Sequence, residues 1–203
     1  MLKKWVKEYI EINKREILQV IGFIILGVFI GIGTYIFADT SVKELAASSI
    51  KDVLNISKSE TYVKTNIILN GVKADALLII IIAMLSVTLF GRWIIYIIMI
   101  LKGAALSVYT ILLFNIFGPL WGIVTTFLLV VLVNIIYLPA LIYLVVSFLD
   151  VNFSVFKASI SSLGITNIYK LLMIIFLSFA VMFSSIVVEQ IASSIVLNIY
   201  TKI

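Results

Sequence analysis

The fold of this chain is decided by the stretch from Ala76 to Leu149, which reads ALLIIIIAMLSVTLFGRWIIYIIMILKGAALSVYTILLFNIFGPLWGIVTTFLLVVLVNIIYLPALIYLVVSFL. Only two of its side chains are charged, Arg92 and Lys102. One membrane crossing uses about 20 apolar residues, so this stretch is long enough for several crossings. Small, polar or charged residues mark the boundaries between its segments: Gly91, Lys102-Gly103, Gly118-Pro119, and Asn134 with Pro139.

The composition of the whole chain agrees with a membrane protein. Of its 203 residues, 63% are hydrophobic and 12% charged, and the mean hydropathy is +1.25. Too few charged residues are present to cover the surface of a water-soluble domain. The apolar runs are continuous, whereas membrane β-strands alternate, which favours helices. The sequence therefore predicts an all-α polytopic protein that crosses the cell membrane several times.

The residue types present exclude much catalytic chemistry. The chain has no cysteine and no histidine, so thiol and imidazole nucleophiles and imidazole metal sites are excluded. The central apolar stretch carries no pair of aspartates. We therefore expect no catalytic residues, no cofactor and no metal, and a protein that is not an enzyme.

The net charge of +5 is better explained by membrane topology than by nucleic acid. Lysine and arginine residues are concentrated ahead of the first apolar segment, as expected of a cytoplasmic N-terminus. They are Lys3, Lys4, Lys7, Lys14 and Arg15. We expect the lipid bilayer as a partner and no nucleic acid.

The N-terminal region divides into a polar segment and a first span. Residues 1–16 have apolar residues near helical spacing, which predicts a cytoplasmic amphipathic segment. This segment either lies on the membrane surface or extends the first span into water. The membrane domain follows at 17–203, beginning with a span at Ile17–Ala38. Within that span, Gly27 and Gly31 form a GxxxG pattern that lets a second helix approach, either of this chain or of another copy.

Asp39–Asp75 is the only sizeable polar stretch, and we interpret it as an extracytoplasmic loop. Ser41 and Glu44 have the spacing of a helix capping box. An apolar stripe at helical spacing follows and comprises Val42, Leu45, Ala46, Ser49, Ile50, Val53 and Leu54. This stripe either docks a partner outside the membrane or lies back on the bundle or on lipid headgroups.

The start of the central stretch allows two segmentations. In one, Ala76–Phe90 is a span and Gly91-Arg92 is the cytoplasmic turn. In the other, Ala76–Leu101 is one helix and Lys102-Gly103 is the turn. We favour the second because it gives the helix its full length. Arg92 would then lie at depth, about 15 Å from the turn, and would need water or a partner.

The following segment begins at an outer turn, Gly118-Pro119. Leu120–Leu149 then contains Asn134 and Pro139, and the proline predicts a kinked or broken helix because it removes a backbone donor. Asn134 either satisfies a freed carbonyl and bonds across helices, or marks a discontinuous helix that lines a polar cavity, as in transporters.

The remaining segments complete about five predicted spans, each long enough to cross the bilayer. A cytoplasmic connection at Asp150–Tyr169 precedes a last span at Leu171–Val188. Glu189 follows at the outer interface, and it is a candidate partner for a buried cation if it lies deeper. We expect Ile191–Ile203 to lie along the outer face.

The order of these segments resembles the stage II sporulation protein M family. That family combines a GxxxG-like first span, an extracytoplasmic loop, a second span with a glycine, a polar residue followed by glycine, an Asn with Pro five residues later, and an acid near the end of the last span. In this chain the matching residues are Gly27, Gly31, Gly91, Lys102, Gly103, Asn134, Pro139 and Glu189.

This resemblance implies a non-enzymatic role. Family members are membrane scaffolds that recruit cell-wall hydrolases of the engulfment machinery to the septum during endospore formation. The partners implied here are therefore such hydrolases, contacted through the loop at 39–75. The alternative from the residues themselves is a small-molecule or ion transporter, because a charge at depth and a broken helix are features of substrate pathways.

Overall fold

The structure is a computed structural model that describes residues 2–56, 61–86, 88, 90–157 and 165–200. Expectations for 57–60, 158–164 and 201–203 lie outside the described residues. The elements are α1 (Leu2–Ile12), α2 (Lys14–Phe37), α3 (Thr40–Ile56), α4 (Thr61–Ser86), α5 (Gly91–Thr126), the π-helix η1 (Phe127–Val131), α6 (Leu132–Lys157) and α7 (Ile165–Tyr200).

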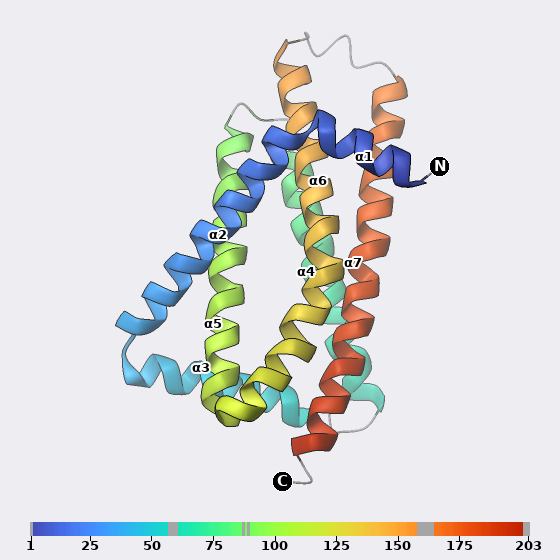
Figure 1. The fold of residues 1–203 in the computed structure, drawn as a ribbon. Coiled ribbons are helices and arrows are strands. Elements are labelled where there is room, and N and C mark those ends of the chain that lie inside the picture. The colour runs from blue at the N-terminus through green and yellow to red at the C-terminus, as the bar shows by residue number, and fades with distance from the viewer. Residues whose placement is uncertain (1, 57–60, 87, 89, 158–164, 201–203) are drawn as a thin grey trace.

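The long helices form a bundle closed at each end by a shorter helix (Figure 1). Helices α4, α5, α6 and α7 run along the long axis of the bundle, and α2 is inclined to this axis. Helix α1 crosses one end, and α3 crosses the other. The two ends of the chain lie at opposite ends of the bundle, so we call these the N-end and the C-end.

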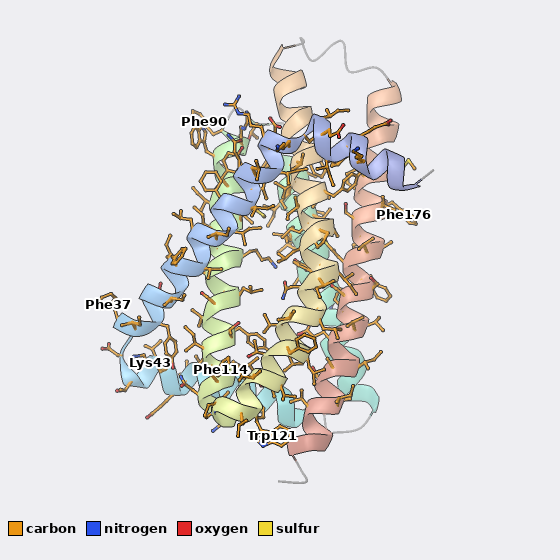
Figure 2. All side chains as sticks on the ribbon, in the orientation of Figure 1. Phe37, Lys43, Phe90, Phe114, Trp121 and Phe176 are labelled. Carbon is orange, nitrogen blue, oxygen red and sulfur yellow. The ribbon has the colours of Figure 1, made fainter. Side chains whose placement is uncertain are left out.

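The exterior of the bundle is apolar, as expected of a surface that faces lipid. Phe37, Phe90 and Phe176 point away from the bundle (Figure 2), with 88%, 73% and 76% of their surface exposed. Among the described residues, three helical stretches are long and apolar enough to cross a membrane: Lys14–Phe37, Gly91–Leu149 and Leu172–Val196. These features support a helical membrane protein.

The 59-residue stretch Gly91–Leu149 folds back on itself at the predicted Gly118-Pro119 turn (Figure 1). Gly118 has φ 74° and ψ 175°, a conformation that residues with a Cβ rarely adopt. Pro119 lacks the backbone N–H that would continue the preceding helix. Together these two residues end the first leg of α5 and allow the chain to return toward the N-end.

Two apolar clusters fill the interior. The N-end cluster includes Ile79, Ile82, Ile95, Met99, Leu141 and Leu144, and each of these side chains is at most 3% exposed. The C-end cluster comprises Leu113, Leu129, Val130, Ala192 and Val196. Each cluster joins several helices of the bundle, so the burial of apolar surface fixes the helices against one another.

Helices α2 and α5 pack closely through glycines. A Cβ on Gly27 would overlap the Ile100 carbonyl, and one on Gly31 would overlap the Ala104 carbonyl. On the facing helix, a Cβ on Gly103 would overlap the Ile24 carbonyl. The GxxxG glycines therefore lie against α5 of the same chain, one of the two arrangements that the pattern allows.

Helix α1 is separate from the first long helix and lies across the N-end. The chain bends at Asn13, whose side-chain amide donates to the Tyr9 carbonyl at 3.2 Å. The Tyr9 hydroxyl is 3.2 Å from the Ser147 hydroxyl of α6, and the rings of Tyr9 and Tyr143 lie 5.0 Å apart. Residues 1–16 therefore do not extend the first span as one straight helix, because α1 lies across the N-end. The cytoplasmic placement of α1 stays a prediction.

The favoured cytoplasmic turn at Lys102-Gly103 is wrong, because both residues lie inside α5. Helix α4 ends at Ser86 and α5 begins at Gly91. The connection is held by backbone bonds from Thr88 to the Leu85 carbonyl at 3.0 Å and from Gly91 to the Thr88 carbonyl at 3.1 Å. Gly91 is buried, and a Cβ there would overlap the Leu85 carbonyl.

Two further boundaries differ from the prediction. The stretch 39–75 is largely helical, because α4 begins at Thr61 and contains Asp75. The predicted capping box does not start α3, since the helix begins at Thr40 and the Asp39 carbonyl accepts from Val42 and Lys43.

The described part of the predicted surface tail, residues 191–200, is instead part of α7, which continues to Tyr200. Ala192 and Val196 are 3% and 2% exposed within the C-end cluster. Burial of these apolar side chains explains why the helix continues past Glu189.

Candidate functional site

A chain of polar side chains connects three helices in the interior of the bundle. The Lys102 ammonium of α5 donates to the Tyr137 hydroxyl of α6 at 3.0 Å. Tyr137 in turn donates to the Asp75 carboxylate of α4 at 3.1 Å. The Lys102 nitrogen also lies 5.2 Å from the centre of the Tyr137 ring, within cation–π range. We call these three residues the Lys–Tyr–Asp network.

The helical register explains why these side chains meet. Asp75 precedes buried Ile79 and Ile82 by four and seven residues, so it shares their face of α4. Lys102 follows buried Met99 by three residues, and Tyr137 precedes buried Leu141 by four, so each shares a helix face with a buried residue. All three helices therefore turn one polar residue toward the interior at the edge of the N-end cluster.

The network lies between the two apolar clusters. Along α5, Lys102 follows Met99 of the N-end cluster and precedes Leu113 of the C-end cluster. Along η1 and α6, Tyr137 follows Val130 of the C-end cluster and precedes Leu141 of the N-end cluster. Lys102 lies eleven residues after Gly91, the first residue of α5. This separation is about 16 Å along the helix axis, which is near half the thickness of a hydrocarbon core.

Burial makes the hydrogen bonds of this network energetically important. Asp75 is 9% exposed, and Lys102 and Tyr137 are half-buried. A buried charge is costly unless it is paired and hydrogen-bonded, and Tyr137 gives Asp75 a donor and Lys102 an acceptor. The opposite charges of Lys102 and Asp75 also attract one another. The arrangement therefore lets two charges occupy an apolar bundle.

Glu189 is placed beside the network without joining its hydrogen bonds. Its side chain on α7 is exposed, and its carboxylate lies within electrostatic range of the Asp75 carboxylate. Among the residues that the structure describes, no ion pair joins Glu189 to a cation. The partner of the cation at depth is thus Asp75, acting through Tyr137.

Arg92 is placed at the N-end rather than at depth. Its Nε donates to the Tyr96 hydroxyl at 3.1 Å, and Tyr96 donates to the Gln19 side-chain oxygen at 3.0 Å. The guanidinium carbon lies 5.9 Å from the centre of the Tyr96 ring. Arg92 is the second residue of α5, so it is the cation at the turn, and Lys102 is the cation in the interior.

The two helix-disturbing residues of the central stretch have local roles. The Asn134 amide donates to the Val130 carbonyl at 2.7 Å, at the end of the π-helix η1. Asn134 therefore bonds to a carbonyl one turn earlier in its own stretch of chain, although Val130 is not the residue whose carbonyl Pro139 frees. Pro139 lies inside α6, which continues from Leu132 to Lys157, so of the predicted kink or break, the break at Pro139 is wrong. The π-helix η1 lies about two to three turns before Pro139.

Two members of the network, Asp75 and Tyr137, were not singled out from the sequence. Asp75 was assigned to the polar loop, although it is the acid next to the apolar stretch. Tyr137 lies between Asn134 and Pro139 and is one of nine tyrosines. Its polarity at an inward-facing position of an apolar helix is the one signal that could have identified it.

The chemistry available to this site is that of charge pairing and proton donation within an apolar interior. Among the described residues, no group of three or more acidic side chains is arranged to hold a metal ion. Comparison of the chain with protein-family models, curated proteins and solved structures finds no match. The function is therefore argued from the bundle itself.

Proposed function

We propose that this chain is a five-pass membrane scaffold of the stage II sporulation protein M type. In this proposal α2, α4, α5, α6 and α7 cross the membrane, and the N-end faces the cytoplasm. The opposite placement of the two chain ends supports an odd number of crossings (Figure 1). The cations Lys14, Arg15 and Arg92 all belong to the N-end, which agrees with the excess of basic residues on cytoplasmic surfaces.

The observation that carries the scaffold role is the exposed apolar face of α3 at the C-end. Val42 and Leu45 are 56% and 72% exposed, although α3 is anchored to the bundle. Ile50 packs against the C-end cluster. The Lys43 ammonium donates to the Ile36 carbonyl at 3.3 Å and lies 5.2 Å from the centre of the Tyr35 ring. A helix held in this way presents its apolar residues in a fixed position.

A fixed apolar surface suits the binding of a protein outside the membrane. Because the surface is preorganised, a partner that binds it loses little free energy to ordering of α3. The partner proposed here is a cell-wall hydrolase of the engulfment machinery, as the family resemblance implies. The bundle would then hold the enzyme at the septal membrane without taking part in its chemistry.

The test of this proposal is a pair of matched substitutions on α3. In sporulating cells, Leu45→Asp should stall membrane migration around the forespore as completely as deletion of the protein does. Ser48→Asp adds the same charge to the same helix at a position that is already polar and exposed, and it should leave migration normal. Microscopy with a membrane dye measures both.

The results would be interpreted together with the amount of each variant in the membrane. Normal migration with Leu45→Asp would overturn the docking role of α3. Normal migration in the deletion strain would overturn the sporulation role as a whole. Equal impairment by Leu45→Asp and Ser48→Asp would show that charge near the headgroups, rather than loss of a binding residue, disturbs α3.

The transport alternative rests on the Lys–Tyr–Asp network, since charges at depth are typical of substrate pathways. Here, however, each of the three side chains has a partner on another helix. Their contacts join α4, α5 and α6, which is the arrangement expected of a structural link. We therefore assign the network a stabilising role within the scaffold.

A further inference from the structure

A second polar region, at the N-end, is independent of α3 and of the Lys–Tyr–Asp network. A pocket of about 630 Å³ lies between the start of α2 and the start of α5, with Leu149 of α6 beside them. Its lining combines basic, polar and aromatic side chains with one acid. The lining residues are Arg15, Glu16, Gln19, Phe23, Arg92, Trp93, Tyr96 and Leu149.

The hydrogen bonds in this pocket leave donors available. The Arg92 Nε can only donate, so the Tyr96 hydroxyl accepts from it and gives its own hydrogen to Gln19. Gln19 therefore uses its oxygen on Tyr96, and the group that it retains for a ligand is its –NH₂. Arg92 retains the four N–H groups of its two terminal nitrogens, and Arg15 contributes a second guanidinium.

The charges of the pocket favour an anion. Two guanidinium groups face one carboxylate, that of Glu16, so the lining carries a net positive charge. Among the described residues, neither Arg15 nor Arg92 forms an ion pair with a carboxylate. Guanidinium groups bind phosphate through paired N–H donors. The N-terminus of α5, which begins at Gly91, adds a partial positive charge beside Arg92.

The surroundings indicate where such a phosphate would come from. Trp93 lines the pocket and is 67% exposed, and Phe90, whose carbonyl accepts from the Trp93 backbone N–H at 3.1 Å, is 73% exposed. Aromatic residues of this kind are enriched at the membrane–water interface, where lipid phosphates lie. A pocket with basic donors and an apolar rim therefore matches a lipid whose headgroup enters the pocket and whose acyl chains lie along α2 and α5.

We propose that this pocket binds the phosphate of an anionic phospholipid, with Arg92 and Arg15 as the phosphate-binding residues. Tyr96 orients the Arg92 guanidinium, and the Gln19 amide donates to the headgroup. Glu16 accepts from the hydroxyl groups of a glycerol headgroup. The site would hold the N-end at the leaflet that it faces, whatever the C-end binds.

The experiment is a lipid titration of the purified full-length protein in detergent, followed by native mass spectrometry. Phosphatidylglycerol should bind as a resolved adduct. Phosphatidylcholine should bind more weakly than phosphatidylglycerol by a factor of about ten or greater. Arg92→Gln and Arg15→Gln should each weaken phosphatidylglycerol binding about ten-fold, the effect of losing one charge-assisted contact. Lys7→Gln removes the same charge from an exposed residue of the N-end that does not line the pocket, and it should change nothing.

Arg15 is exposed, so Arg15→Gln keeps the test decisive if Arg92→Gln fails to fold. Equal binding of phosphatidylglycerol to the wild type and both arginine variants would overturn the proposal. Binding of glycerol phosphate as tight as that of phosphatidylglycerol would overturn the lipid as its source and indicate a soluble phosphate compound. Neither result depends on the role of α3.

Discussion

Lys102→Met is expected to lower the free energy of unfolding by about 3–5 kcal/mol, the scale of the loss when a buried charge is left without the opposite charge that compensates it. The substitution retains the length and much of the volume of the side chain but removes the ammonium that Tyr137 accepts from. The Asp75 carboxylate then remains at 9% exposure in an apolar interior without a nearby cation. Asp75→Asn should be destabilising for the converse reason.

The double variant distinguishes a charge pair from two separate effects. Replacing a buried pair by uncharged residues is often close to neutral, so Asp75→Asn with Lys102→Met should be more stable than either single variant. Unfolding by sodium dodecyl sulphate in mixed micelles, followed by circular dichroism, measures all three. Lys14→Met, which removes an exposed cation at the start of α2, should stay within about 0.5 kcal/mol of the wild type. Additive losses in the double variant would contradict the pairing of the two charges.

Gly27→Ala is expected to destabilise the bundle by about 1–3 kcal/mol or more, the usual range for overpacking. The added methyl group would overlap the backbone carbonyl of Ile100, and backbone atoms cannot move aside as a flexible side chain can. Helices α2 and α5 would have to separate, which would also disturb the contact between Gly31 and Ala104.

The same helix provides controls of opposite sign. A Cβ on Gly22 or Gly33 would have no atom within 4 Å. Gly22→Ala and Gly33→Ala should therefore stabilise the protein by about 0.5–1 kcal/mol, because alanine is the better helix former. The unfolding assay above measures these variants as well. Equal effects of alanine at positions 27 and 33 would contradict the close α2–α5 contact.

The features that could be predicted from the sequence are those that depend on local composition. Continuous apolar runs indicated membrane helices, and Gly118-Pro119 correctly indicated a reversal, because φ > 0 and a missing N–H are requirements of the residues themselves. The spacing of Gly27 and Gly31 likewise indicated a site of close helix packing. Their partner could not be predicted, because the contact with Ile100 and Ala104 depends on tertiary structure.

The error at Lys102-Gly103 has a physical explanation. A cation followed by glycine between apolar runs is typical of a turn, and the residues that allow it to lie inside a helix are far away in the sequence. Lys102 depends on Tyr137, 35 residues later, and Tyr137 depends on Asp75, 62 residues earlier. Gly103 is required by contact with Ile24 of α2 rather than by a turn. None of these partners is visible in the local periodicity.

The proposed five-pass arrangement with α3 outside is tested most directly by two-sided cysteine labelling, since the chain has no native cysteine. Single cysteines would be introduced as Lys14→Cys, Val42→Cys and Phe90→Cys, three exposed positions, and probed with an impermeant thiol reagent. In intact cells only Val42→Cys should react, whereas Lys14→Cys and Phe90→Cys should react only in inverted membrane vesicles. Labelling of Val42→Cys and Phe90→Cys from the same side would contradict the proposal, because α4 would then not cross the membrane between them.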